Sequence, residues 1–493
     1  MDTALLINLP RQEAERPPAV IAGLAGMCKS ANIDYDVLDL NLAAIVTMPA
    51  AVRKDFEDYL VYYKKTSLYI DDFIDLVTKN LPDKHYKIIA VSLFTFETLR
   101  AANIVLPLLR QKYPKSKIVI GGHGATSPDN DNNGVPFYKH AIAKQIIDHY
   151  ILGEADLAFQ AYIKNPDDWI STDQKFFVDN LNQIPFACYD KILPSTYCKN
   201  GTMSAYVTGS RGCVRDCTFC DVGYIWTKYR FRTAEHLFNE ILHHHLEYGV
   251  TLIEFTDNLI NGSLSEFKKF NKLLVNAQST YPSLKKLRYR GDYICRPKNQ
   301  FSEEDFRTMV EAGGTDLVVG IESFSVPVRY HMGKKFDNND VDFHLYCSGK
   351  YGVSNTFLMQ VGYPTETLTD HQTNIEYLYR YQKYALSRVI KLIRWGFTTG
   401  ILKGSPLDVK YREKLPLINE LDNDEYLYGE FDWVNLSNAQ LTFAERIRRR
   451  MELHKVTKLL RYPQPRVYDE FSFIFSQLSR TYNSRRVLEI VAK

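Results

Sequence analysis

The sequence has no apolar run close to the roughly 20 residues that a membrane-spanning helix needs. Its N-terminal apolar stretch is too short for a secretory signal peptide. The formal net charge of +3 is small for 493 residues and does not support a nucleic-acid-binding surface. We therefore expect a cytoplasmic protein that neither spans a membrane nor binds nucleic acid.

The sequence also lacks the dense, evenly used cysteines of a secreted disulfide framework. It has eight cysteines, of which three crowd into eight residues and five are scattered. The scattered five are Cys28, Cys188, Cys198, Cys295 and Cys347. We interpret them as small buried apolar residues, and we treat the crowded three as a separate feature.

The first third of the chain alternates between strand-like and helix-like segments. The apolar, β-branched runs that predict strands lie at 3–8, 35–40, 86–92 and 117–122, and residues 149–156 are predicted to supply a fifth strand and its turn. Helical periodicity occupies Pro18 to Ser30 and Phe96 to Lys112, and a charged, tyrosine-rich stretch at 55–79 is predicted to be a helical insertion. Such alternation is typical of βα units with a parallel sheet. We predict an α/β domain over 1–165 with a doubly wound, Rossmann-like sheet.

A second βα series follows an aperiodic, proline-containing linker at 166–200. Its predicted strands lie at 205–210, 251–257, 285–292, 315–323, 355–364 and 387–395. A helix is expected at 233–249, and another begins at Ser302, a good N-cap with Asp305 three residues on. Six units in about 200 residues predict a partial (β/α)6 barrel of the TIM type at 201–400. The remainder, 401–493, is charged and predicted to be mainly helical.

The crowded cysteines are Cys213, Cys217 and Cys220, with the spacing C-x3-C-x2-C. Thiolates hold iron–sulfur clusters, usually four for each cubane. Three leave one iron free for a substrate or cofactor, as the open position of a catalytic zinc does. Zinc itself is the alternative, but its fourth ligand would have to be Asp216, Asp221 or His236, and none has the usual finger spacing.

This segment resembles the radical S-adenosylmethionine superfamily in its cysteine spacing and in its place after the first barrel strand. The resemblance implies a [4Fe–4S] cluster on the three cysteines, with S-adenosylmethionine chelating the open iron. Reductive cleavage of S-adenosylmethionine would then give a 5′-deoxyadenosyl radical. Phe219, just before the last cysteine, is similar to the family's aromatic residue that packs on the adenine.

Later strands of the barrel resemble the family in the same order. The positions that this implies near the cofactor are Asp257 and Asn258 after the second strand, Arg290 on the third, Glu322 and Ser323 ending the fourth, and Gly362 and Pro364 after the fifth. A strand-end acid is a plausible partner for the ammonium group of S-adenosylmethionine. The segment 328–336 is similar to the family's linker after the fourth strand. Glu322 and Arg290 could alternatively be solvated or paired charges without a functional role.

The N-terminal domain resembles the cobalamin-binding domain of one large class of this superfamily. Ser92, Gly121 and Gly122 stand at predicted strand ends, where open α/β sheets bind ligands. The class's D-x-H-x-x-G motif, which supplies a histidine to cobalt, is absent, and His123 is wrongly placed for it. The resemblance therefore implies that cobalamin is a possible cofactor, bound without a protein histidine. The alternative is a domain that binds no cobalamin.

These expectations together predict a radical S-adenosylmethionine enzyme, of which a cobalamin-dependent C-methyltransferase is one form. A non-methylating oxidoreductase or cyclase is the alternative enzyme, and an iron–sulfur electron-transfer or sensor protein is the alternative outside enzymes. Methylthio transfer is disfavoured, because those relatives carry three more cysteines at the N-terminus and residues 1–160 offer only Cys28. The expected partners are a small-molecule or peptide substrate and an electron donor such as flavodoxin or ferredoxin.

Overall fold

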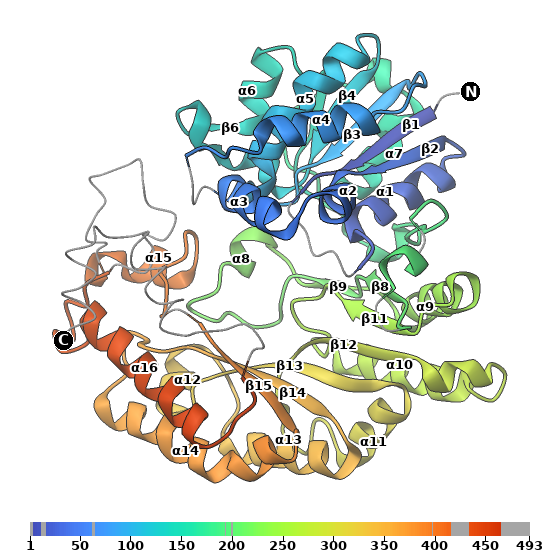
Figure 1. Cartoon of the computed structure of the whole chain (residues 1–493). Coiled ribbons are helices and arrows are strands. Elements are labelled where there is room, and N and C mark those ends of the chain that lie inside the picture. Colours follow the sequence, from blue (N-terminus) through green and yellow to red (C-terminus); the bar gives the residue numbers. More distant parts are fainter. Residues whose placement is uncertain are drawn as a thin grey trace. The chain divides into compact units, whose positions relative to one another are not determined.

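The computed structural model describes residues 3–10, 16–61, 65–192, 194–198, 201–396, 398–415 and 433–464. Contacts divide the chain into two compact units, the first Met1–Val207 with Asn239–Thr251, and the second Thr208–Phe238 with Leu252–Lys493. Each has a parallel sheet that alternates with helices (Figure 1). Within the described ranges, no helix is both long and apolar enough to cross a membrane.

The first sheet has five parallel strands in the order β2-β1-β3-β4-β7. Their bounds are β1 Thr3–Asn8, β2 Asp34–Asp39, β3 Ile88–Ser92, β4 Lys117–Gly121 and β7 His149–Ile151. In β1 and β3 every residue is buried, as expected for strands that are covered by helices on both faces. By order of appearance this is the 2-1-3-4-5 doubly wound topology, which places ligands at the carboxyl ends of the strands.

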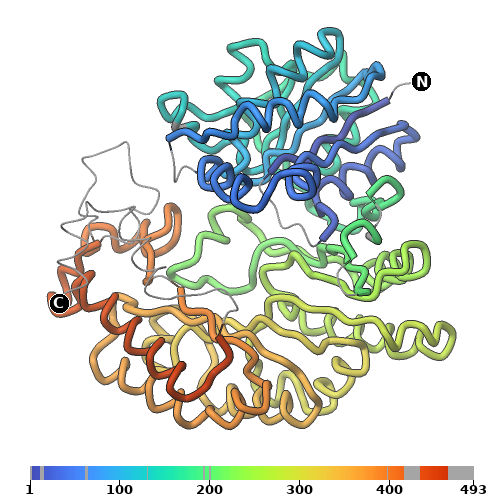
Figure 2. The backbone as a smooth tube through the Cα atoms, viewed as in Figure 1, coloured from blue at the N-terminus to red at the C-terminus, as the bar shows by residue number. Residues whose placement is uncertain are grey.

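The helices of the first unit follow the strands in sequence, as the tube in Figure 2 shows. They are α1 Ala19–Ser30, α2 Leu40–Thr47, α3 Ala50–Leu60, α4 Ile70–Asn80, α5 Leu99–Lys112, α6 Phe137–Ala143 and α7 Ala155–Lys164. Where the sequence predicted one helical stretch at 55–79, the structure has two helices, α3 and α4, and α3 begins earlier, at Ala50. Both contribute to the main core through side chains such as Phe56 and Phe73.

The second sheet has six strands in the order β15-β14-β13-β12-β11-β8. Their bounds are β8 Ser204–Val207, β11 Leu252–Phe255, β12 Arg288–Tyr293, β13 Gly314–Glu322, β14 Ser354–Met359 and β15 Ile390–Trp395. The strands from β11 to β15 pair in parallel, each with its neighbour. An open sheet of six successive strands is a partial barrel, so the predicted α/β class, doubly wound sheet and partial barrel are confirmed.

Helices cover the outer face of this sheet (Figure 1). They include α9 Ala234–Tyr248, α10 Leu264–Ala277, α11 Glu303–Glu311, α13 Asn338–Tyr351 and α14 Leu368–Leu386. Helix α16 Phe443–Leu459 packs against α14, and α12 Val326–His331 and α15 Pro406–Tyr411 are two shorter helices of the second unit. Ser302 caps α11 in a capping box with Asp305, as the sequence predicted. Of the predicted helical C-terminal region, α15 and α16 are described, whereas residues 416–432 and 465–493 lie outside the described residues.

Candidate functional site

The three clustered cysteines lie on one loop that leaves β8 and ends at a short helix, α8 (Val222–Ile225). All three are half-buried free thiols. The backbone folds tightly, since the Cys220 N–H donates to the Cys217 carbonyl at 3.0 Å. Gly212 has φ of +81°, and a Cβ there would lie 2.9 Å from the Lys228 carbonyl oxygen. The loop conformation therefore needs glycine at this position.

The thiols influence one another electrostatically. Burial raises the pKa of Cys217 to about 11, against the lowering effect of Lys334, and the charges of Cys220 and Cys213 raise it further. Burial likewise raises the pKa of Cys220, with Cys213 again contributing. Because the charges of these cysteines affect one another's pKa, the three thiols lie near one another. Thiols in such a setting become thiolate ligands when iron binds, because the metal charge displaces the proton.

Within the described ranges, no group of three or more His, Cys, Asp or Glu side chains is placed to hold a metal ion. A cluster makes a different demand on the protein from a single ion. In a cubane each thiolate binds its own iron atom, so the sulfurs stand around the cluster and do not converge on one point. A loop of three half-buried free thiols fits that requirement.

Asp257 follows β11 and holds the start of the cysteine loop. Its carboxylate accepts hydrogen bonds from the Gly209 N–H at 2.7 Å and the Ser210 hydroxyl at 2.6 Å. Burial raises the pKa of this carboxyl to about 6, although these two donors and Arg232 favour the charged form. The structure thus places Asp257 behind the loop, and the neighbouring Asn258 is half-buried.

Arg290 on β12 is engaged by an acid that the sequence analysis missed. Its Nε lies 2.7 Å from the carboxylate of Glu254, which is buried on β11. The strand register aligns the two residues directly. Two residues along β12, burial raises the pKa of Asp292 to about 6, while Arg290 and Arg394 oppose the shift. Ion-paired charges therefore line this part of the sheet.

Glu322 ends β13 in an unusual conformation. Its φ is +66°, which strains a residue with a side chain and is commonest at functional sites. The carboxylate accepts from Lys334 Nζ at 2.9 Å and from Gln360 Nε2 at 3.3 Å. The next residue, Ser323, turns away and donates to Asn374 on α14 at 3.2 Å. The structure therefore separates these two predicted site residues.

The loop after β14 is held by helix α16. The Gly362 N–H donates to Glu366 at 3.1 Å, and the same carboxylate lies 2.9 Å from Arg449 in a buried ion pair. Gly362 has φ of +74°, and a Cβ there would lie 2.5 Å from the Arg446 side chain. The side chain of Asn435 donates to the Pro364 carbonyl at 2.7 Å. Glycine is thus required here by a neighbouring arginine as well as by its backbone angle.

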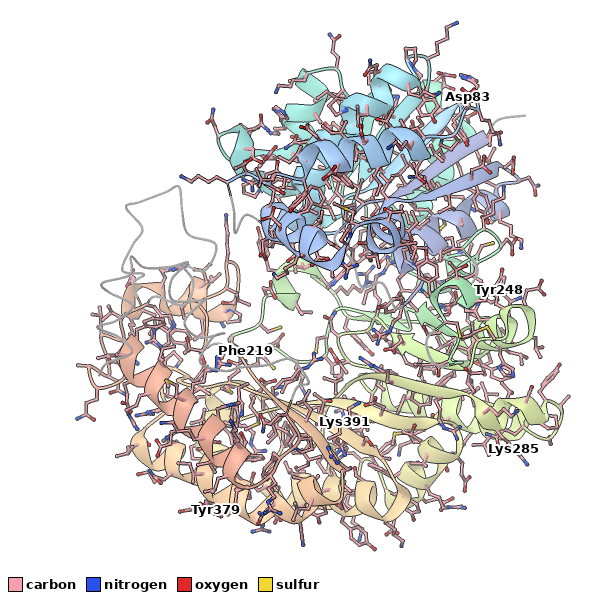
Figure 3. The ribbon with its side chains drawn as sticks, in the orientation of Figure 1. Asp83, Phe219, Tyr248, Lys285, Tyr379 and Lys391 are labelled. Carbon is pink, nitrogen blue, oxygen red and sulfur yellow. The ribbon has the colours of Figure 1, made fainter. Side chains whose placement is uncertain are left out.

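Phe219 lies on the cysteine loop, where Figure 3 labels it. It packs against a buried cluster that includes Met332 and Tyr363. Lys334 Nζ lies 5.8 Å from the centre of its ring. The residue before it, Thr218, shares a hydrogen bond of 2.7 Å with the Tyr363 hydroxyl. This aromatic residue therefore stands between the cysteines and the end of the β14 segment.

In the first unit, the predicted positions form the carboxyl edge of the five-stranded sheet. Ser92 is buried and pairs in register with Gly121. Gly122 has φ of +99°, and a Cβ there would lie 2.4 Å from the Leu93 carbonyl oxygen. This glycine lets two backbone segments cross closely. Beyond this edge, Phe94 is 52% exposed, an apolar feature that the sequence analysis did not single out.

Comparisons with known proteins show which family and which structures this chain resembles. Residues 207–378 match the model of the Radical SAM superfamily. An uncharacterized methyltransferase, PH0819 of Pyrococcus horikoshii, is 24% identical over 205 residues, which are 41% of this chain and 42% of that protein. The chain thus aligns with less than half the length of this curated relative.

Two solved structures share the fold. One is the radical S-adenosylmethionine methyltransferase TsrM from Kitasatospora setae, with cobalamin and a [4Fe–4S] cluster bound, at TM-score 0.58 and 15% identity over 84% of this chain and 75% of that one. The other is the cobalamin-dependent S-adenosylmethionine radical enzyme OxsB with aqua-cobalamin bound, at TM-score 0.66 and 13% identity over 100% of this chain and 70% of that one.

Proposed function

We propose that this chain, whose residues 207–378 match the Radical SAM superfamily, is a radical SAM enzyme and acts as a cobalamin-dependent methyltransferase on carbon. Enzymes of this type use a [4Fe–4S] cluster and S-adenosylmethionine. The observation that carries the proposal is the loop with Cys213, Cys217 and Cys220, held at its start by buried Asp257. We assign the three thiols as the protein ligands of the cluster.

A reduced cluster held by these thiols would supply the electron for cleavage of a carbon–sulfur bond of S-adenosylmethionine. The chain's own residues would bind and orient the cofactor. Phe219 offers an aromatic face next to the cysteines, and Glu322 offers an acid at a strand end, suited to an ammonium group. The β14 loop, fixed by the buried Arg449–Glu366 pair, would present backbone groups. Asp257 and Ser323, which are occupied with hydrogen bonds of their own, would act by positioning the segments that contain them.

The first unit supports the cobalamin part of the proposal. Its 2-1-3-4-5 sheet brings Ser92, Gly121 and Gly122 to the carboxyl edge, where this topology binds ligands. Gly121 and Gly122 place no side chain at this edge, so a flat ligand would meet backbone there, and exposed Phe94 offers apolar contact. The similarity in fold to TsrM and OxsB, whose structures contain cobalamin, also supports cobalamin binding. The D-x-H-x-x-G motif is absent, so cobalt would bind without a protein histidine.

Anaerobic reconstitution tests this function. The full chain is supplied with iron, sulfide and hydroxocobalamin, separated by gel filtration, then reduced with dithionite or flavodoxin in the presence of S-adenosylmethionine. We expect stoichiometric corrinoid to remain bound and 5′-deoxyadenosine to form. A protein that carries an intact cluster but releases all corrinoid would contradict methyl transfer. It would favour a non-methylating oxidoreductase or cyclase instead.

A further inference from the structure

A tight turn after α12 packs directly on the cysteine loop. The Thr218 N–H donates to the Met332 carbonyl at 3.0 Å, and the Thr218 hydroxyl donates to the His331 carbonyl at 3.3 Å. A Cβ at Gly333, whose φ is +81°, would lie 2.9 Å from the Asp216 carbonyl oxygen and 3.4 Å from the Cys217 Cα. The backbone of the turn therefore touches the backbone of the loop, and the spacing between them is fixed.

The residue that follows this turn, Lys334, points its side chain into the protein. The residue is only 7% exposed, which is rare for a lysine unless it is paired. Its Nζ lies 2.9 Å from Glu322 Oε1 and 3.0 Å from the Gly320 carbonyl oxygen. The same atom lies 5.8 Å from the centre of the Phe219 ring. The ammonium group thus bridges the strand-end acid and the cysteine loop.

The surroundings keep this lysine charged. Burial acts to lower the pKa of Lys334, but the charges of Glu322, Cys217 and Cys213 outweigh it, and the pKa ends above its ordinary value. A buried ammonium loses its hydration by water, which is unfavourable unless anions surround it. Glu322 is one such anion. Its second oxygen accepts a hydrogen bond from Gln360, and the other acidic groups that act on Lys334 are the Asp292 carboxyl and the thiols of the cysteine loop.

A fixed positive charge beside a redox centre affects its reduction. Adding one electron to a cluster makes it more negative, and a nearby cation in a low-dielectric setting stabilises the reduced form. Net charge and surroundings are among the factors that set cluster potentials. The electron itself would come from a low-potential donor of the flavodoxin or ferredoxin class. The position of Lys334 gives the protein a means of easing this transfer.

We propose that Lys334 is a positioning residue that holds Glu322 in its strained conformation and places a positive charge beside the cysteine loop, which raises the reduction potential of the bound cluster. The inference rests on the proposed cluster. It adds a residue that is not a cluster ligand and acts through its charge. The neighbouring Lys335 is exposed, so the same turn offers a matched control.

The test compares Lys334→Met, Lys334→Arg and Lys335→Met in the reconstituted full chain. The midpoint potential of the cluster is measured by redox titration followed by electron paramagnetic resonance. We expect a more negative potential in Lys334→Met, with near wild-type values in Lys334→Arg and Lys335→Met. Wild-type potential in a fully loaded Lys334→Met protein would overturn the inference.

Loss of the cluster is also informative. If Lys334→Met fails to hold iron while Lys334→Arg keeps it at the wild-type potential, a positive charge is needed at this place, as proposed. If Lys334→Arg also loses iron, cluster binding depends on the shape of the lysine side chain and not on its charge, and the inference is wrong. A wild-type protein that forms no cluster would instead refute the proposed function, so the two failures are distinguishable.

Discussion

The carboxyl ends of the two parallel sheets present different chemical groups. In the five-stranded sheet, the edge is made by backbone crossings, such as Gly122 against Leu93, with exposed Phe94 beyond them. In the six-stranded sheet, it is made by buried charges, such as Glu322 with Lys334 and Arg449 with Glu366. This difference agrees with the proposal of a flat corrin at the first edge and charged S-adenosylmethionine at the second. Two parallel α/β sheets of different topology thus present different chemical groups at their carboxyl ends.

The largest effect on stability should come from the buried charges of the second unit. Arg449→Met leaves Glu366 buried without its cation, because the pair is almost fully enclosed. Removing one partner of such a pair costs about 3–5 kcal/mol. The neighbouring Arg448 pairs with Glu445 on the exposed side of the same helix, so Arg448→Met should cost at most about 1 kcal/mol. Urea unfolding of both variants measures the difference, and equal losses would show that burial of the pair does not matter.

A pH effect follows from a buried histidine of the same unit. Burial lowers the pKa of His344 to about 4, against the hydrogen bond to Asn355. The two atoms that bond, His344 Nε2 and Asn355 Oδ1, lie 2.7 Å apart. As the pH falls, the folded state therefore binds this proton at a lower pH than the unfolded state does. The free energy of unfolding should drop by about 3 kcal/mol between pH 6.5 and 4 on this account.

The matched variant for this effect is His344→Gln, which keeps an amide donor for Asn355 and does not titrate. Its unfolding free energy should depend less steeply on pH over that window than that of the wild-type protein. Denaturant unfolding at a series of pH values measures both slopes. Parallel curves would show that His344 is not held neutral by the fold.

A smaller effect is expected at the backbone crossing of the first unit. Gly122 has φ of +99° and ψ of 168°, a region that is almost restricted to glycine. Gly122→Ala adds a contact with the Leu93 carbonyl to this strain, and together these should cost about 2–3 kcal/mol. Gly134 has φ of +70° with nothing near its missing Cβ, so Gly134→Ala should cost only about 1 kcal/mol. Thermal unfolding that ranks Gly134→Ala equal to Gly122→Ala would refute the crossing as the cause.

The smallest effect is expected at His123. Its side chain is exposed at the same sheet edge, so His123→Ala should change the free energy of unfolding by less than about 0.5 kcal/mol. If cobalt binds without a protein histidine, the absorption spectrum of the reconstituted corrinoid should also stay unchanged. A spectral shift in this variant would identify His123 as a cobalt ligand. The first sheet edge would then bind its ligand through a polar side chain, as the second does.

Local patterns in the sequence predicted much of this molecule. Buried β-branched runs predicted the strands, and the Ser302–Asp305 spacing predicted a capping box that the structure contains. These features depend on neighbours within a few residues. The cysteine motif is local in the same sense, since its three members lie within eight residues of one loop.

The partners of the site residues could not be predicted in this way. Glu366 and Arg449 are 83 residues apart, and Ser323 and Asn374 are 51 apart. Parallel βα units bring such residues together only after the sheet and its helices have formed. For the same reason, Lys334 stood in a segment that the sequence analysis marked only as a linker. The strained φ of Glu322 had no signal in the sequence.

The central claim is that Cys213, Cys217 and Cys220 together hold a cluster that cleaves S-adenosylmethionine. The most direct test is iron content and 5′-deoxyadenosine formation in alanine variants of each, with Cys295→Ala as control, a buried thiol of the same unit. We predict loss of both cluster and cleavage in each of the three, and full iron content in Cys295→Ala. Retention of the cluster in any of the three, or its loss in Cys295→Ala, would contradict the account.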